Sequence, residues 1–179
     1  MMNRAEVKSW FKNYGSWVIA VFHFVGILLL GGPWSSDFVM LTPLNLLLLS
    51  VVYLITSDKV KRPLLYALPA LMGFLVEMLG TNTGFPFGEY SYSSVLGPGL
   101  LGTPFLIGVL WWVLLRSFND VFSRISSNKT IISLATGLGM LLLDIFIEPV
   151  AIGLGFWEWQ AAEVPLENYM AWFVLSFVF

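Results

Sequence analysis

Six long apolar stretches constrain the fold of this chain more than any other feature. A membrane-spanning helix needs about 20 mainly apolar residues to cross a hydrocarbon core of about 30 Å. Hydrophobic residues make up 58% of the 179 residues and charged residues only 11%, whereas soluble domains carry about 25% charged residues. So few charges could not cover a water-facing surface. We therefore expect an all-α, polytopic transmembrane helix bundle of about six helices, a single integral membrane domain over residues 1–179, with spans near residues 16–31, 38–56, 63–80, 100–118, 130–153 and 168–179.

Lys and Arg residues fall on alternate connections between these stretches. Three precede the first stretch, three lie in residues 57–62 and three lie in or beside the fourth connection. The segments near residue 37, at 81–99 and at 156–167 have none. The nine basic residues are Arg4, Lys8, Lys12, Lys59, Lys61, Arg62, Arg116, Arg124 and Lys129. Positive charges accumulate on the cytoplasmic side of membrane proteins. The alternation predicts a multi-pass protein of the cell membrane with a cytoplasmic N-terminus.

The last apolar stretch is short. As a helix, residues 168–179 would extend only about 18 Å, which is too little to cross a bilayer. We therefore expect the sixth span to be incomplete.

Two long segments on the non-cytoplasmic side are rich in aromatic residues. One reads TNTGFPFGEYSYSSVLGPGLLGTP and contains Glu89; the other reads FWEWQAAEVPLENY and contains three acids. Simple connectors would carry fewer aromatic residues, so we expect both segments to fold back over the helices and residues 81–99 to form an interfacial lid. For Trp157 and Trp159, a plain aromatic belt at headgroup level explains the pattern equally well.

Three acidic residues lie inside the apolar stretches. Glu77 is in the third, and Asp144 and Glu148 are in the fifth. A charge at the bilayer centre costs at least about 2.5–3.5 kcal/mol, so such residues usually face a cavity or a partner. At 1.5 Å per residue, Glu77 and Asp144 both stand about 21 Å above the cytoplasmic start of their helices. Because residues four apart share a helix face, the three acids are expected to line one buried pocket.

A group of carboxyls without basic partners can supply proton chemistry. Burial and like-charged neighbours both favour the protonated form of a carboxyl, so a protonated acid beside an ionised one is expected, which is an acid/base pair. The alternative is a structural role in which the acids bond backbone or helix ends. A structural role is most plausible for Glu148, because the following Pro149 removes a helical hydrogen bond and tends to kink a helix.

Other polar residues inside the spans are few. Asn45 lies about 10 Å below the outer surface, where it could bond a pocket acid or serve as contact between helices. His23 is the single histidine and lies too low to join the acids. There are no cysteines, which excludes disulfides and thiolate metal sites. We expect neither a metal nor a cofactor.

A buried acid pocket lined by aromatic residues suits an isoprenoid substrate that enters from the bilayer. Protonation of a trisubstituted terminal alkene gives a tertiary carbocation, which aromatic faces stabilise by about 2 kcal/mol or more each when desolvated. Water can then attack to give a tertiary alcohol, or a neighbouring double bond can attack to give a ring.

Five segments, in order, resemble one known family. They read EMLGTNTGFPFGEYSY, GTPFLIGVLWW, DIFIEPVA, FWEW and VPLENYMAWF, and they run from about Glu77 to Phe173. They are similar to the bacterial and archaeal carotenoid hydratases of the CruF family, which includes hydratases of γ-carotene, lycopene and bisanhydrobacterioruberin. The resemblance implies cofactor-independent addition of water across the terminal 1′,2′ double bond of a linear carotenoid end.

Roles follow from the resemblance and the chemistry together. One of Asp144 or Glu77 is expected to donate the proton, another acid to position or deprotonate the water, and Glu148 to tune them or share that task. The carotenoid, such as lycopene or γ-carotene, and the lipid bilayer are the expected partners. The residues expected to bind the substrate are Asn45, Phe85, Phe87, Glu89, Tyr90, Tyr92, Trp157, Trp159, Asn168 and Trp172.

Two other functions stay open on the sequence. A membrane-embedded isoprenoid cyclase would use the same acids but keep the pocket dry. A protein that only binds carotenoid, or that conducts protons or cations, would leave the substrate unmodified. Permeation routes distribute carboxyls through the full membrane thickness, whereas here they concentrate in the outer half.

Overall fold

The computed structural model describes residues 4–56 and 63–179. The chain divides into two compact units, Met1–Pro63 and Leu64–Phe179, and each is described by itself. That they form one integral membrane domain stays a prediction.

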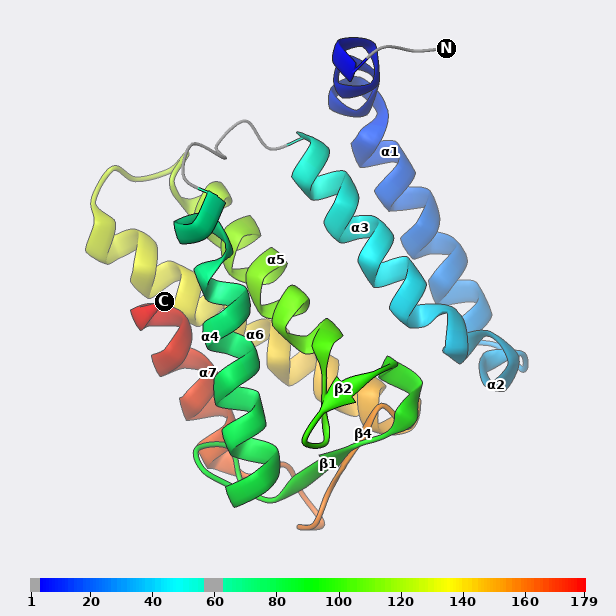
Figure 1. Cartoon of the computed structure of the whole chain (residues 1–179), viewed down its shortest axis with the longest axis vertical. Helices are drawn as coiled ribbons and strands as arrows, with labels where there is room; N and C mark the ends of the chain where they lie inside the picture. Colours follow the sequence, from blue (N-terminus) through cyan, green and yellow to red (C-terminus); the bar gives the residue numbers. More distant parts are fainter. Residues whose placement is uncertain (1–3, 57–62) are drawn as a thin grey trace. The chain divides into compact units, whose positions relative to one another are not determined.

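The first unit is a pair of helices joined by short turns. Helix α1 spans Arg4–Leu30 and helix α3 spans Thr42–Thr56, with α2 (Ser35–Phe38) and the 3-10 turn η1 (Val39–Leu41) between them (Figure 1). The two long helices pack together where Gly15 lies against Val52, which is almost completely buried. Most other large side chains of α1 are exposed.

The second unit contains four helices that pack around a polar centre. They are α4 (Pro63–Thr83), α5 (Phe105–Phe122), α6 (Lys129–Gly153) and α7 (Leu166–Val178). Helix α6 packs against both α5 and α7. Helices α4 and α5 approach closely because Gly73 and Gly108 have no side chains: a Cβ at Gly73 would lie 2.4 Å from Trp111 Cβ, and one at Gly108 would lie 2.7 Å from the carbonyl oxygen of Ala70.

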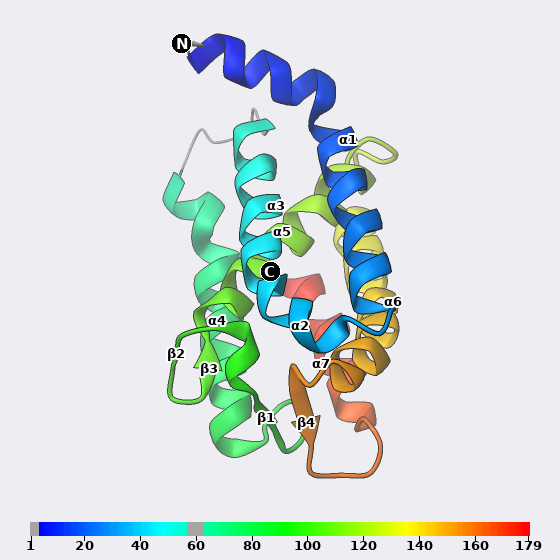
Figure 2. The same ribbon diagram turned by 90° about the vertical axis from the view of Figure 1, so that its right-hand side faces the viewer.

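Two short antiparallel ribbons complete the second unit. Strand β1 (Tyr90–Tyr92) pairs with β4 (Trp157–Trp159), although 64 residues separate them in the chain. Figures 1 and 2 show this ribbon beside the ends of α4 and α6. Between β1 and α5 lie the 3-10 turn η2 (Ser94–Leu96) and a tight hairpin of β2 (Gly99–Leu100) and β3 (Thr103–Pro104). The hairpin turns through Leu101 and Gly102, both with positive φ.

The fold class expected from the sequence is confirmed as an all-α, membrane-type protein. In the described part of the chain, four helical stretches are long and apolar enough to cross a membrane: Asn13–Leu30, Ser35–Thr56, Phe105–Phe122 and Lys129–Gly153. Six spans and a cytoplasmic N-terminus stay predictions. The basic loop at 57–62, with Lys59, Lys61 and Arg62, lies outside the described residues.

The fourth stretch begins later than the sequence predicts. We expected a helix from residue 100, but α5 starts at Phe105 because residues 99–104 form the β2–β3 hairpin. Gly99 requires this arrangement, since a Cβ there would lie 2.1 Å from the carbonyl oxygen of Thr103. Apolar composition alone does not distinguish such a hairpin from a first helical turn.

Candidate active site

A cavity of about 70 Å³ lies inside the second unit. One water needs roughly 10–15 Å³ by this kind of measure, so the cavity has room for several waters or the tip of a hydrocarbon chain. All four helices of the unit and the β1–β4 ribbon contribute to its wall, whose residues are Glu77, Phe87, Tyr90, Tyr92, Ile107, Leu110, Trp111, Leu114, Ile147, Glu148, Trp157, Trp159, Asn168 and Trp172. The wall is apolar except for two carboxyls and the few donors that face them.

Glu77 of α4 is held by three hydrogen-bond donors and is only 2% exposed. The hydroxyls of Tyr90 and Tyr92 donate to its Oε2 at 2.6 and 2.7 Å, and the indole Nε1 of Trp111 donates to Oε1 at 2.8 Å. Both oxygens therefore act as acceptors at distances typical of bonds to a charged group. This arrangement fits an ionised carboxylate.

Glu148 of α6 faces the cavity with an uneven set of donors. The indoles of Trp157 and Trp159 both donate to Oε2, at 3.0 and 2.9 Å. Its other oxygen, Oε1, receives only a 3.4 Å contact from Asn168 Nδ2. Helix α6 continues through Pro149 to Gly153, so Glu148 does not end the helix. The structural alternative considered for this residue is thus not supported by its position.

Asp144 stands one turn before Glu148 on the same helix but does not line the cavity. Its Oδ2 accepts a 2.7 Å bond from Asn168 Nδ2, while its Oδ1 is buried without a hydrogen-bond partner. The same amide nitrogen thus contacts both acids of α6. Asn168 is 2% exposed, lies in the first turn of α7 and lines the cavity, so it links Asp144 to the wall.

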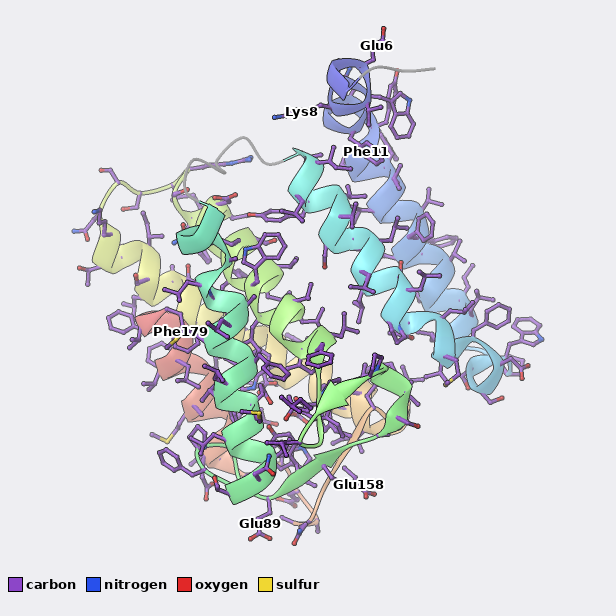
Figure 3. The ribbon with its side chains drawn as sticks, in the orientation of Figure 1. Glu6, Lys8, Phe11, Glu89, Glu158 and Phe179 are labelled. Carbon is purple, nitrogen blue, oxygen red and sulfur yellow. The ribbon has the colours of Figure 1, made fainter. Side chains whose placement is uncertain are left out.

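The β1–β4 ribbon positions four of the donors. Tyr90 pairs with Trp159 and Tyr92 with Trp157, so all four rings lie on one face, as alternation along a strand requires. The tyrosines bond Glu77 and the tryptophans bond Glu148. The opposite face carries Ser91 and Glu158, and Figure 3 shows Glu158 pointing away from the helices. One small ribbon therefore fixes both carboxyls.

Burial of the two tyrosines keeps their hydroxyls neutral. Desolvation, followed by the nearby charge of Glu77, raises the pKa of both Tyr90 and Tyr92 above the ordinary value of 10.0. A neutral phenol can donate a hydrogen bond, whereas a phenolate cannot. The pair therefore stays a donor pair well into the alkaline range.

Gly80 makes room for this donor pair. A Cβ at Gly80 would lie 2.6 Å from a ring carbon of Phe87 and 2.9 Å from the hydroxyl of Tyr90. Glycine is thus required about one turn beyond Glu77, where Phe87 and Tyr90 pack against α4.

Trp111 is a hydrogen-bonding residue of the wall that the sequence does not single out. Its indole bonds Glu77, and its ring stacks on Trp172 with centroids 4.6 Å apart. It belongs to the segment GTPFLIGVLWW, but a tryptophan in an apolar helix gives no sign of which neighbour it meets. The ribbon did carry a signal, because YSY and WEW both alternate aromatic and polar residues with the period of a strand.

Most of the residues expected to bind substrate line the cavity, but three do not. Phe87, Tyr90, Tyr92, Trp157, Trp159, Asn168 and Trp172 are in the wall. Phe85 is 70% exposed. Glu89 is also exposed, and Figure 3 shows it on the outside of the second unit. Asn45 belongs to the first unit. Their roles stay predictions, as does opening of residues 81–99 as a lid.

No cluster of three His, Asp or Glu side chains among residues 4–56 and 63–179 has the geometry to hold a metal ion. The polar groups of the wall are carboxyls, phenols, indoles and one amide. Such groups can donate, accept and relocate protons, and the surrounding rings can stabilise a cation.

Comparison with known proteins decides the family. Residues 38–179 match the family described as "Carotenoid biosynthesis protein". The chain belongs to this family. The match covers every helix and strand of the second unit, so both carboxyls of the cavity and the ribbon that holds them lie inside it, as the resemblance in the sequence predicted.

One curated relative of the chain is the bisanhydrobacterioruberin hydratase of Haloarcula japonica. The two are 32% identical over 110 residues, which is 57% of this chain and 38% of the relative. The match thus spans less than two fifths of the length of that relative. No solved structure matches the chain.

Proposed function

We propose that the chain is a carotenoid hydratase that adds water, without a cofactor, to the terminal 1′,2′ double bond of a linear carotenoid end. One observation carries the proposal: two buried carboxyls, Glu77 and Glu148, face one aromatic cavity, and donors bond both oxygens of Glu77 closely but only one oxygen of Glu148. The family and the name of the hydratase relative support it. Lycopene, γ-carotene or a related carotenoid is the proposed substrate, and the cell membrane the proposed location.

The hydrogen bonds favour Glu148 as the proton donor. Two indoles occupy Oε2, so a proton on Glu148 would reside on Oε1, whose single contact of 3.4 Å is long. Asp144 shares the same amide donor, and two neighbouring carboxyls resist being ionised together. The Asp144–Glu148 pair is therefore suited to hold one proton. This differs from the expectation that Asp144 or Glu77 would donate.

Glu77 is suited to the opposite role. Three donors stabilise its carboxylate form, and a fixed negative charge beside the cavity stabilises a developing cation. Its Oε1 accepts only one bond, which leaves that oxygen able to receive a proton from water. Trp111 and Trp172, stacked on each other, add their ring faces to the wall.

The proposed reaction keeps atoms and charges balanced. Glu148 transfers its proton to the less substituted carbon of the terminal double bond, and the positive charge develops on the tertiary carbon. The oxygen of a water molecule forms a bond to that carbon, and the water proton passes to Glu77. The product has gained one water, and proton exchange between the two acids through the solvent restores the starting state.

The test is expression of the full chain in a host that accumulates a linear carotenoid, followed by chromatography and mass spectrometry. We expect a product heavier than the substrate by one water. Glu158→Gln is the matched control, because Glu158 lies on the same ribbon but on its exposed face, and it should behave as wild type. A product of unchanged mass would replace hydration with cyclisation, and unmodified carotenoid that copurifies with the chain would indicate a binding protein.

A further inference from the structure

We propose that the side-chain oxygen of Asn168 binds and aims the water molecule that attacks the carbocation. The inference rests on the proposed hydration and deepens it. It assigns the reacting water, for which no residue has been identified so far, to one amide in the cavity wall.

The orientation of the Asn168 amide follows from its neighbours. Nδ2 lies 2.7 Å from Asp144 Oδ2 and 3.4 Å from Glu148 Oε1. Carboxyl oxygens require a donor, so the NH2 group faces the two acids and the amide oxygen points away from them. Asn168 is almost completely buried and lines the cavity. The amide oxygen is therefore a hydrogen-bond acceptor that the two acids leave unoccupied, on a residue of the cavity wall.

This acceptor lies beside the proposed proton donor. Glu148 Oε1 and the amide of Asn168 are in contact, so an alkene carbon that receives the proton from Oε1 has the amide next to it. A water that donates one hydrogen to the amide oxygen keeps its own lone pairs free for the cation. Ile147, Leu110 and Leu114, which also line the wall, have no polar side chains and cannot hold water in this way.

The fate of the cation depends on whether a water molecule is held beside it. When water is not held, the cation cannot be captured and instead loses a proton to the nearest carboxylate. Loss of a hydrogen from the carbon that was protonated restores the original double bond and returns the carotenoid unhydrated, whereas loss from an adjacent methyl group gives an isomer of the same mass. In heavy water the acid that protonates the alkene carries deuterium, so the returned carotenoid acquires deuterium at its end group.

The experiment follows both outcomes in the same sample. Membranes that contain the full chain are incubated with lycopene in heavy water, and the water gained and the deuterium in recovered lycopene are measured by mass spectrometry. With Asn168→Leu we expect hydration to fall about tenfold or more, the scale of one lost hydrogen bond at a reacting atom. Deuterium in the recovered lycopene should rise above the wild-type level.

Two further variants keep the test decisive. Asn168→Ser, which is smaller and avoids overfilling the wall, should show the same shift from hydration to exchange. Asn119→Leu, in the same unit but outside the cavity wall, should match wild type. Hydration at the wild-type rate in both Asn168 variants, or loss of both hydration and exchange in variants that melt like wild type, would overturn the assignment. If wild type itself does not hydrate lycopene or γ-carotene, the proposed function fails instead.

Discussion

The two sides of the cavity differ in the hydrogen-bond donors that they offer to their carboxyl groups. On the α4 side, Glu77 accepts three short bonds, from two phenols and one indole. On the α6 side, two indoles bond Oε2 of Glu148, but Glu148 Oε1 and Asp144 Oδ2 share one amide nitrogen, and Asp144 Oδ1 has no partner. A surplus of donors stabilises a carboxylate, whereas a shortage favours a retained proton. The difference in donor supply is what allows two acids in one wall to take different roles.

The largest expected effect comes from Glu148→Gln. An amide cannot supply the proton, so hydration should fall by roughly 10² to 10⁴, the usual contribution of a general acid. Product formation in membranes, normalised to the amount of folded protein, measures the loss. Hydration within a few fold of wild type would show that Glu148 is not the proton donor. The proposed difference between the α4 and α6 sides would then be contradicted as well.

Glu77→Gln should cost about 10² in hydration rate, because it removes the charge that faces the cation. Its NH2 group would also meet phenol or indole donors, at a cost of about 1–3 kcal/mol in stability. Thermal unfolding therefore has to be measured beside turnover. Glu158→Gln, on the outer face of the ribbon, serves as the control for both measurements. Unchanged turnover in Glu77→Gln would contradict a role for the α4 side.

Trp111→Phe tests one hydrogen-bond donor on the α4 side without removing a charge. The variant loses the bond to Glu77 Oε1 and retains a ring that can stack on Trp172. A bond to a charged group contributes about 1.5–3 kcal/mol, so hydration should fall by roughly ten- to a hundredfold. Trp112→Phe, at the next position but outside the cavity wall, should have a smaller effect on turnover. Equal effects would mean that packing, rather than the bond, is what matters.

Asp144→Asn tests whether an acid that lies outside the cavity wall contributes to the hydration rate. Asp144 is buried but contacts the cavity only through Asn168, and an asparagine carbonyl can still accept that bond. We expect about a tenfold loss of hydration, smaller than for Glu148→Gln, because the neighbouring charge is removed while the proton donor stays. A loss as large as that of Glu148→Gln would indicate that the two acids act as one unit.

The smallest effect concerns stability at high pH. The pKa of Tyr90 and Tyr92 is raised in the folded chain above 10.0, so above about pH 10 the unfolded tyrosines ionise while the folded ones do not. Stability from this difference is fully present below about pH 10 and falls as the pH rises further. The unfolding temperature of wild type should decline more steeply between about pH 9 and 11 than that of the Tyr90→Phe, Tyr92→Phe double variant. Parallel declines would contradict burial of the two phenols.

The sequence predicted the acids of the site because charge is expensive in an apolar helix. Glu77 and Glu148 were found in this way, and both line the cavity. The same argument gave Asp144 equal weight, although it lies behind Asn168. A spacing of four residues places two side chains on one helix face but does not say which one a neighbouring helix will cover.

The donors were harder to predict than the acids. Tyr90, Tyr92, Trp157 and Trp159 were expected near substrate, but their pairing as a ribbon was not, because a membrane-interface belt also explains tyrosine and tryptophan there. Trp111 meets Glu77 through the close crossing of α4 and α5 at Gly73, a tertiary contact without a local signal. The hairpin at 99–104 was likewise hidden in apolar composition.

The most direct test compares Glu148→Gln with Glu77→Gln in heavy water, with lycopene as substrate and mass spectrometry as the readout. If Glu148 gives the proton and Glu77 serves the later steps, the first variant should show neither hydration nor deuterium in the recovered carotenoid. The second should lose hydration yet still exchange deuterium. Deuterium exchange that survives in Glu148→Gln and disappears in Glu77→Gln would contradict the account.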